Sequence, residues 1–118
     1  MKITKLDQVF SEYVRALSGG YCKKCGKYFG EKRLQNAHFF GRIRHTVRWD
    51  TRNVVALCGE CHYWLDVNPI AKTDFMLTVL SEEDVADLER IARMTTKQYP
   101  IDKEKLLEYY TKRLKEVE

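Results

Sequence analysis

Two pairs of cysteines with the same internal spacing constrain this chain more than any other feature. Its four cysteines form two C-x-x-C pairs and none is left over: Cys22 with Cys25, and Cys58 with Cys61. Two such pairs can place four thiolates around one tetrahedral zinc ion. Gly26 and Gly59 suit the tight turns that such pairs require. The spacing therefore predicts one structural zinc site, with a redox pair or four unrelated buried cysteines as the alternatives.

The length and composition of the chain favour a single domain, residues 1–118, that gains folding free energy from the metal. Its 118 residues are 44% hydrophobic, which supports a modest core. The first residues lack the apolar run of a signal peptide, and no stretch approaches a membrane span. We therefore expect a cytoplasmic protein with reduced thiols and no membrane partner.

Positive charge is concentrated between the outer cysteines. Residues 22–62 contain nine Lys or Arg and three acidic residues, whereas residues 63–118 contain nine basic and twelve acidic residues. A basic surface attracts a polyanion, because binding releases the counterions of its phosphates. The first segment is therefore expected to bind nucleic acid, and an ordinary solvated face is the alternative.

Apolar periodicity predicts helices at both ends of the chain. Residues 4–17 form an amphipathic pattern whose start fits a cap made by Thr4 and Asp7. Two further helices are expected within residues 81–117, and we expect them to pack on the rest of the domain as a hairpin or to form a homodimer contact. Residues 70–80 fit either a helix or a strand.

The segment between the helical ends, residues 21–68, is expected to contain two strands and a helix. Residues 33–40 alternate weakly and predict a strand that ends near His38. Residues 48–56 lead into a second apolar strand. A helix is expected from Gly59 until Asn68 and Pro69 end it.

Three polar residues inside this segment form a recognisable order: His38, then Asn53, then His62 directly after the last cysteine. The surrounding phrases are AHFFGR and RWDTRNVVALCGECH. Over residues 6–66 the chain resembles the zinc-bearing HNH, or ββα-metal, endonucleases, and more narrowly the phage recombination proteins of the NinG type. The cysteine spacing is also similar to that of phage recombination endonuclease VII. The resemblance implies an α+β fold with a ββα-metal module.

The resemblance also implies a role for each of the three residues. His38 would be the general base, Asn53 would brace the loop and orient the histidine, and His62 would bind a catalytic Mg²⁺ or Mn²⁺ ion. A simple turn asparagine is the alternative for Asn53, and a zinc ligand is the alternative for His62.

One position departs from the family pattern. Many members carry Asp or His directly before the base as a second metal ligand, but this chain has Ala37 there. Asp66 is the expected replacement, because it lies one helical turn after His62 and both side chains would project to one face. Asp50 and His45 are weaker candidates. An aspartate introduced at position 37 is expected to restore a ligand in part.

Basic and aromatic residues near the motif are candidates for contact with DNA. The arginines expected to clamp phosphates are Arg42, Arg44, Arg48 and Arg52. Arg48 and Arg52 could instead form ion pairs with Asp50 or with the acidic helices. Trp49 and Trp64 are expected in the core, with stacking on an unpaired base as the alternative.

Together these features predict a metal-dependent DNA endonuclease that hydrolyses phosphodiester bonds. The resemblance suggests branched or recombination intermediates as substrates, in the cytoplasm of a bacterial or phage-infected cell. The alternative is a non-catalytic zinc-binding module that interacts with nucleic acid or protein.

Overall fold

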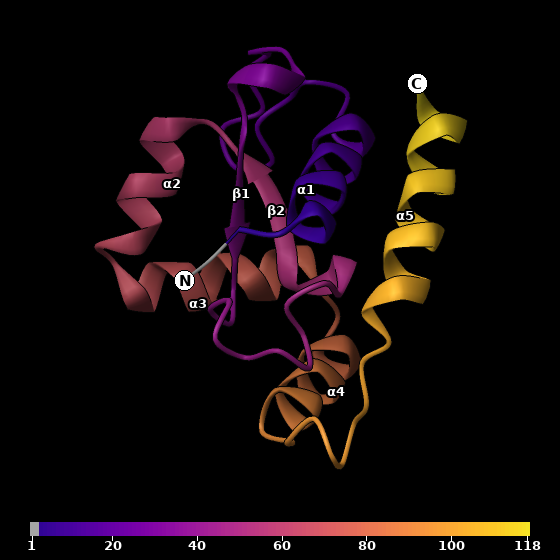
Figure 1. The fold of residues 1–118 in the computed structure, drawn as a ribbon. Helices are drawn as coiled ribbons and strands as arrows, with labels where there is room; N and C mark the ends of the chain where they lie inside the picture. Colours follow the sequence, from indigo (N-terminus) through magenta and orange to yellow (C-terminus); the bar gives the residue numbers. More distant parts are fainter. Residues whose placement is uncertain (1–2) are drawn as a thin grey trace.

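A two-stranded antiparallel sheet lies among five α-helices in the computed structural model, which describes residues 3–118 (Figure 1). The helices are α1 Lys5–Leu17, α2 Gly59–Asp66, α3 Pro69–Val79, α4 Glu82–Ala92 and α5 Lys103–Val117. The strands are β1 Gln35–His38 and β2 Val54–Leu57, and short 3₁₀ turns, η1 Glu31–Arg33 and η2 Thr51–Asn53, precede them. The predicted α+β class is confirmed, and the ambiguous stretch 70–80 is helical.

Helix α1 begins where its capping residues predict. The Thr4 hydroxyl accepts a hydrogen bond from the Asp7 N–H at 3.3 Å, and the Asp7 carboxylate accepts one from the Thr4 N–H at 2.8 Å. This reciprocal pair satisfies two N–H groups that a helix leaves unpaired at its start. The apolar face of α1 is buried in the main core and includes Leu6, Val9, Phe10, Tyr13 and Val14.

The pairing of the two strands decides which residues of β1 face the core. Ala37 lies opposite Val55 and is buried, whereas Asn36 and His38 are only partly buried. Side chains alternate along a strand, so Asn36 and His38 share the face opposite to that of Ala37. All four residues of β2 are buried, which makes β2 the central strand of the core.

The two C-terminal helices separate instead of forming the predicted hairpin. Helix α5 packs along α1 (Figure 1). Between them the Tyr110 ring lies 4.9 Å from the ring of Phe10, centroid to centroid. Helix α4 packs on the segment before β2, where its Leu88 and Ile91 form a second cluster with Val47. The apolar stripes of α4 and α5 therefore cover different parts of the domain, and the hairpin prediction is wrong.

None of the helices in residues 3–118 has the length and apolar character that a membrane span requires.

Candidate functional site

The four cysteines form a site that can hold a metal ion such as zinc. Their sulfur atoms all lie within 4.8 Å of one another, and the sulfurs of Cys22 and Cys58 belong to buried residues. In a tetrahedral zinc site the sulfurs are roughly 3.8 Å apart, because each Zn–S bond is about 2.3 Å long. The cluster thus fits zinc with small adjustments of the side chains.

Local backbone geometry brings each cysteine pair to the cluster. In the first turn, the Gly26 N–H donates to the Cys22 carbonyl at 2.9 Å, and Gly26 has a φ of 74°, which favours glycine. In the second, the Cys58 sulfur caps α2 and accepts a hydrogen bond from the Cys61 N–H at 3.5 Å. Gly59 begins α2 without a positive φ, so the second turn does not need glycine as the sequence suggested.

The surroundings of Cys22 and Cys61 shift the pKa values of these two thiols in opposite directions. Burial opposes ionisation of Cys22, but N–H groups of Cys25, Cys58 and Lys24 donate to its sulfur and lower its pKa to about 6. Burial and the neighbouring sulfurs raise the pKa of Cys61 to about 12. Of these two thiols, Cys22 is therefore the more ready to bind a cation as a thiolate.

A cleft of about 630 Å³ lies between α1, the end of β1 and α2. One wall is formed by β1, the loop after β1 and α2, and it includes Asn36, His38, Gly41, Arg42, His62 and Asp66. Its wall from α1 includes Asp7, Gln8, Ser11, Glu12 and Arg15. The structure therefore brings His38, His62 and Asp66 together. Asp50 and His45 do not line this cleft, which removes them as candidate ligands.

His38 is held in one orientation and in its neutral form. Its Nε2 lies 3.1 Å from the Arg48 carbonyl oxygen, which can only accept, so Nε2 carries the proton and Nδ1 carries the lone pair. Burial and the positive charges of Arg42 and Arg48 outweigh this bond and lower the His38 pKa from 6.5 to about 4. His38 is therefore uncharged at neutral pH, with its one proton on Nε2.

His62 is oriented by a residue of β1. Its Nδ1 donates to Gln35 Oε1 at 2.8 Å, and its Nε2, 3.4 Å from Asp66 Oδ2, can carry either a lone pair for a metal ion or a proton shared with Asp66. The other Asp66 oxygen, Oδ1, lies 3.3 Å from Lys72 Nζ. The expected proximity of His62 and Asp66 on one face of α2 is confirmed. The contact of Asp66 with Lys72 was not predicted from the sequence.

Asn53 ties the loop after β1 to the start of β2. It is fully buried; its Oδ1 accepts from the Phe40 N–H at 2.8 Å, and its Nδ2 donates to the carbonyls of Phe40 and Val47 at 2.9 and 3.1 Å. These bonds fix both ends of the loop that follows His38. The side chain therefore braces this loop and makes more contacts than a turn asparagine would.

Asn36 is a residue of the cleft that sequence reasoning missed. Its Oδ1 is buried, and it is the one buried side-chain oxygen or nitrogen of residues 3–118 without a hydrogen-bond partner. Ala37, by contrast, faces the core, so an aspartate there would enter the core instead of the cleft. The period of two along β1 could have identified Asn36, because it lies two residues before His38.

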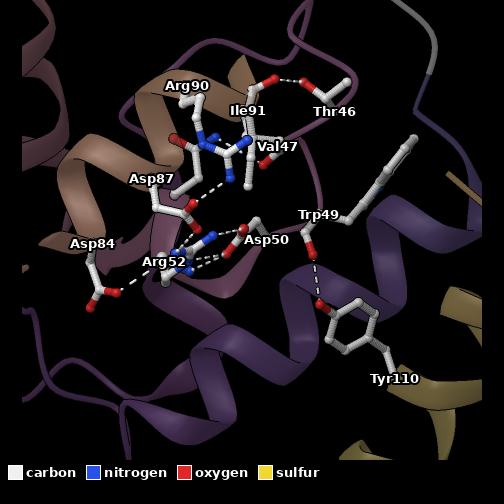
Figure 2. Close-up of polar contacts among 11 residues, drawn as sticks. Thr46, Val47, Trp49, Asp50, Arg52, Asp84, Asp87, Arg90, Ile91 and Tyr110 are labelled. Atoms are coloured by element: carbon white, nitrogen blue, oxygen red, sulfur yellow. Dashed lines mark hydrogen bonds and ion pairs between the residues drawn. The ribbon is translucent and has the colours of Figure 1, made fainter. Parts of the chain in front are cut away.

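Two of the four candidate arginines are committed to ion pairs. Arg48 is buried, and its guanidinium forms two bonds of 2.7 and 2.9 Å with the Asp7 carboxylate of α1. Arg52 lies 2.9 Å from both Asp50 and Asp87, as Figure 2 shows. The prediction that these two side chains clamp phosphates is replaced by the alternative of structural ion pairs.

The other two arginines, Arg42 and Arg44, are exposed on the loop after β1. Arg42 lines the cleft, whereas Arg44 lines a second hollow. They remain candidates for phosphate contacts.

The two tryptophans differ. Trp49 is buried, and its indole N–H donates to Asp7 at 2.9 Å, as expected for a core residue. Trp64 is 47% exposed beside the cysteine cluster, with Lys24 Nζ 4.7 Å from the centre of its ring, so its prediction as a core residue is wrong. Trp64 lines a hollow beside the cluster together with Lys24, Cys25 and Phe29.

Comparison with known proteins finds no family model, no curated protein and no solved structure that matches this chain.

Proposed function

We propose that this protein is a metal-dependent endonuclease of the HNH type that hydrolyses phosphodiester bonds of DNA. One observation carries the proposal: a neutral histidine with a fixed tautomer, His38, lines the same cleft as His62 and Asp66. The order of elements also supports it, because two antiparallel strands are followed directly by the helix that carries His62.

His38 supplies the general base. Its Nδ1 lone pair takes a proton from water, while its Nε2–H stays bonded to the Arg48 carbonyl. Burial and the charges of Arg42 and Arg48 oppose the resulting imidazolium, and the carboxylate of Asp7 offsets only a small part of this. The low pKa keeps His38 unprotonated over the physiological range, although it also makes the ring a modest base.

His62 and Asp66 would hold a divalent cation, with Mg²⁺ or Mn²⁺ as the expected ion. The chemistry of the donors fits: His62 presents the Nε2 lone pair, Asp66 presents carboxylate oxygen and charge, and Asn36 has a buried oxygen without a partner. A divalent cation bound here would stabilise the charge of the transition state and of the leaving oxygen. Gln35 would fix the ring of His62 from behind, as partners of metal-bound histidines do.

The cysteine cluster would support this arrangement when it holds zinc. Cys58 and Cys61 belong to the cap and first turn of α2, directly before His62. The Lys23 N–H also donates to the Ala56 carbonyl of β2 at 3.0 Å, which ties the first cysteine pair to the sheet. A metal there would therefore fix α2, and with it His62, relative to His38.

The experiment is cleavage of supercoiled plasmid with Mg²⁺ or Mn²⁺ by the wild type, His38→Ala and Lys112→Ala. Lys112→Ala is the control, because Lys112 is exposed on α5 and lines neither the cleft nor the second hollow. We expect cutting by the wild type and the control, and loss of cutting in His38→Ala. Linear, nicked and four-way substrates would then show whether branched intermediates are preferred.

The alternative is a non-catalytic zinc-binding module. The ion pairs His62–Asp66 and Asp66–Lys72 favour it, because they satisfy the carboxylate without any cation from solution. DNA binding by the wild type with no cutting in either metal would support this alternative. Equal cutting by His38→Ala and wild type would show that His38 is not the base.

A further inference from the structure

A second hollow, of about 730 Å³, is lined by the loop that follows β1, the end of α4 and the start of α5. We call it the basic groove. Its basic lining residues are Arg44, His45, Arg93 and Lys103, and none of the described residues that line it is acidic. The catalytic cleft, by contrast, is lined by carboxylates of Asp7, Glu12 and Asp66 as well as by arginines. The cleft suits a cation beside a phosphate, whereas the basic groove suits anions alone.

We propose that the basic groove binds phosphates of the DNA backbone that flank the bond to be cut. The inference rests on the proposed function and extends it with a binding site. It assigns phosphate contacts to Arg93 and Lys103, which lie far along the chain from the HNH-like segment. Binding of nucleic acid phosphates by such residues releases counterions, so each contact adds to the salt dependence of affinity.

The walls of the groove are fixed before any ligand binds. The Thr46 hydroxyl donates to the Ile91 carbonyl at 2.7 Å, which attaches the loop to α4 (Figure 2). The Trp49 carbonyl accepts from the Tyr110 hydroxyl at 2.6 Å, which attaches the same segment to α5. A site held in this way loses little conformational entropy on binding.

The cations of the groove are available to a ligand. Arg93 pairs with Glu89, but its side chain is 76% exposed, and a pair of this kind contributes little free energy. Lys103 Nζ lies 5.7 Å from the centre of the Trp49 ring, which also lines the groove. Neither interaction would oppose a phosphate strongly.

The loop itself connects the basic groove with the cleft. Arg42 lines the cleft and Arg44 lines the groove. Two residues span at most about 7 Å of backbone, so a single DNA strand that crosses the loop can contact both arginines. The flanking phosphates would then reach Arg93 and Lys103 on the far wall.

The test compares two double variants with the same loss of charge. Arg93→Gln with Lys103→Gln removes two cations of the groove, and Lys112→Gln with Lys115→Gln removes two exposed cations of α5. Binding of a short fluorescein-labelled DNA duplex is measured by anisotropy over a range of salt concentrations without divalent cations. Zinc content and circular dichroism confirm that each variant is folded.

We expect the groove variant to bind about tenfold more weakly and to lose about two units of salt slope, because each phosphate contact contributes about 0.9. The α5 variant should keep the wild-type affinity and the wild-type salt slope. Equal effects in the two variants, or none in either, would overturn the inference. The inference would also be overturned if the groove variant lost binding of inorganic phosphate but bound DNA as the wild type does, since the groove would then be a site for a free ion. If the wild type cuts plasmid and the groove variant binds DNA normally, only the proposed groove is refuted. If the wild type neither binds nor cuts DNA, the proposed function is refuted as well.

Discussion

The Nε2 atom of His38 lies 3.1 Å from the carbonyl oxygen of Arg48, and the guanidinium of Arg48 is in turn held by Asp7. A carboxylate in the first turn of α1 therefore determines the orientation of a histidine at the end of β1. Asp7 also accepts the indole N–H of Trp49, so it fixes two consecutive residues of the segment. Helix α1 is thus both a wall of the cleft and part of the support of His38.

The protonation of His38 gives a direct prediction. We expect its ring to stay neutral down to about pH 5 and to titrate near pH 4, because burial and two arginines lower its pKa from 6.5 to about 4. NMR titration of the histidine ring protons measures this, with His38→Ala to assign the signal. A midpoint near pH 6.5 would contradict the buried, oriented ring.

The same shift affects stability with a definite sign. The folded state binds the His38 proton less readily than the unfolded state, so this group lowers the free energy of unfolding as pH falls from about 6.5 towards 4. Above pH 6.5 it contributes nothing. His38→Ala should therefore show a smaller loss of stability over this range than the wild type.

The second prediction concerns Asp7→Asn, which keeps the shape of the side chain and removes its charge. The side chains of Arg48 and Asp7 are only 4% and 10% exposed. Breaking a buried ion pair by changing one partner costs about 3–5 kcal/mol, so the variant should lose about that much free energy of unfolding in urea titrations. Glu89→Gln, which breaks an exposed pair with Arg93, is the control and should change stability by less than about 0.5 kcal/mol.

The pH dependence of this loss provides a further check. Burial opposes the charge of Asp7, but bonds from Thr4, Arg48 and Trp49 outweigh it and hold the pKa of its carboxyl below 3.8. The stabilisation is therefore complete above the unfolded pKa and is lost as pH falls through the lower folded value. A difference between wild type and variant that vanished already at pH 6 would argue against this pair.

Zinc removal is the third prediction. Elemental analysis should find one zinc ion per chain, and Cys58→Ser should lower the melting temperature strongly, because Cys58 caps α2 as well as joining the cluster. A chelator should unfold the wild type, and added zinc should restore it. Folded protein that contains no zinc and ignores chelators would contradict this prediction.

Local rules predicted the start of the first helix and the metal cluster. Thr4, Ser81 and Asp102 each accept a hydrogen bond from the N–H three residues later, and such caps can be recognised from neighbouring residues alone. The cysteine spacing is equally local. These features depend on contacts within a few residues, so the chain order is sufficient to find them.

Contacts between distant residues could not be predicted in this way. The pair of Arg48 with Asp7 joins positions 41 residues apart, and nothing in either segment identifies its partner. The pairing of Ala37 with Val55 of the buried strand β2, which places Ala37 against the core, also joins distant positions. The separation of α4 from α5 likewise depends on which apolar surfaces remain uncovered after the sheet and α1 have packed.

The last prediction separates the two roles open to Asp66, whose oxygens lie 3.4 Å from His62 Nε2 and 3.3 Å from Lys72 Nζ. If Asp66 helps to bind the divalent cation, Asp66→Asn should weaken Mn²⁺ binding, measured by calorimetry on the zinc-loaded protein. Lys72→Ala should strengthen it, because the ammonium group competes for the same carboxylate. If Asp66 only pairs with Lys72, Mn²⁺ binding should be the same in both variants and in the wild type. Because the two variants are expected to change Mn²⁺ affinity in opposite directions, a general loss of structure could not explain the result.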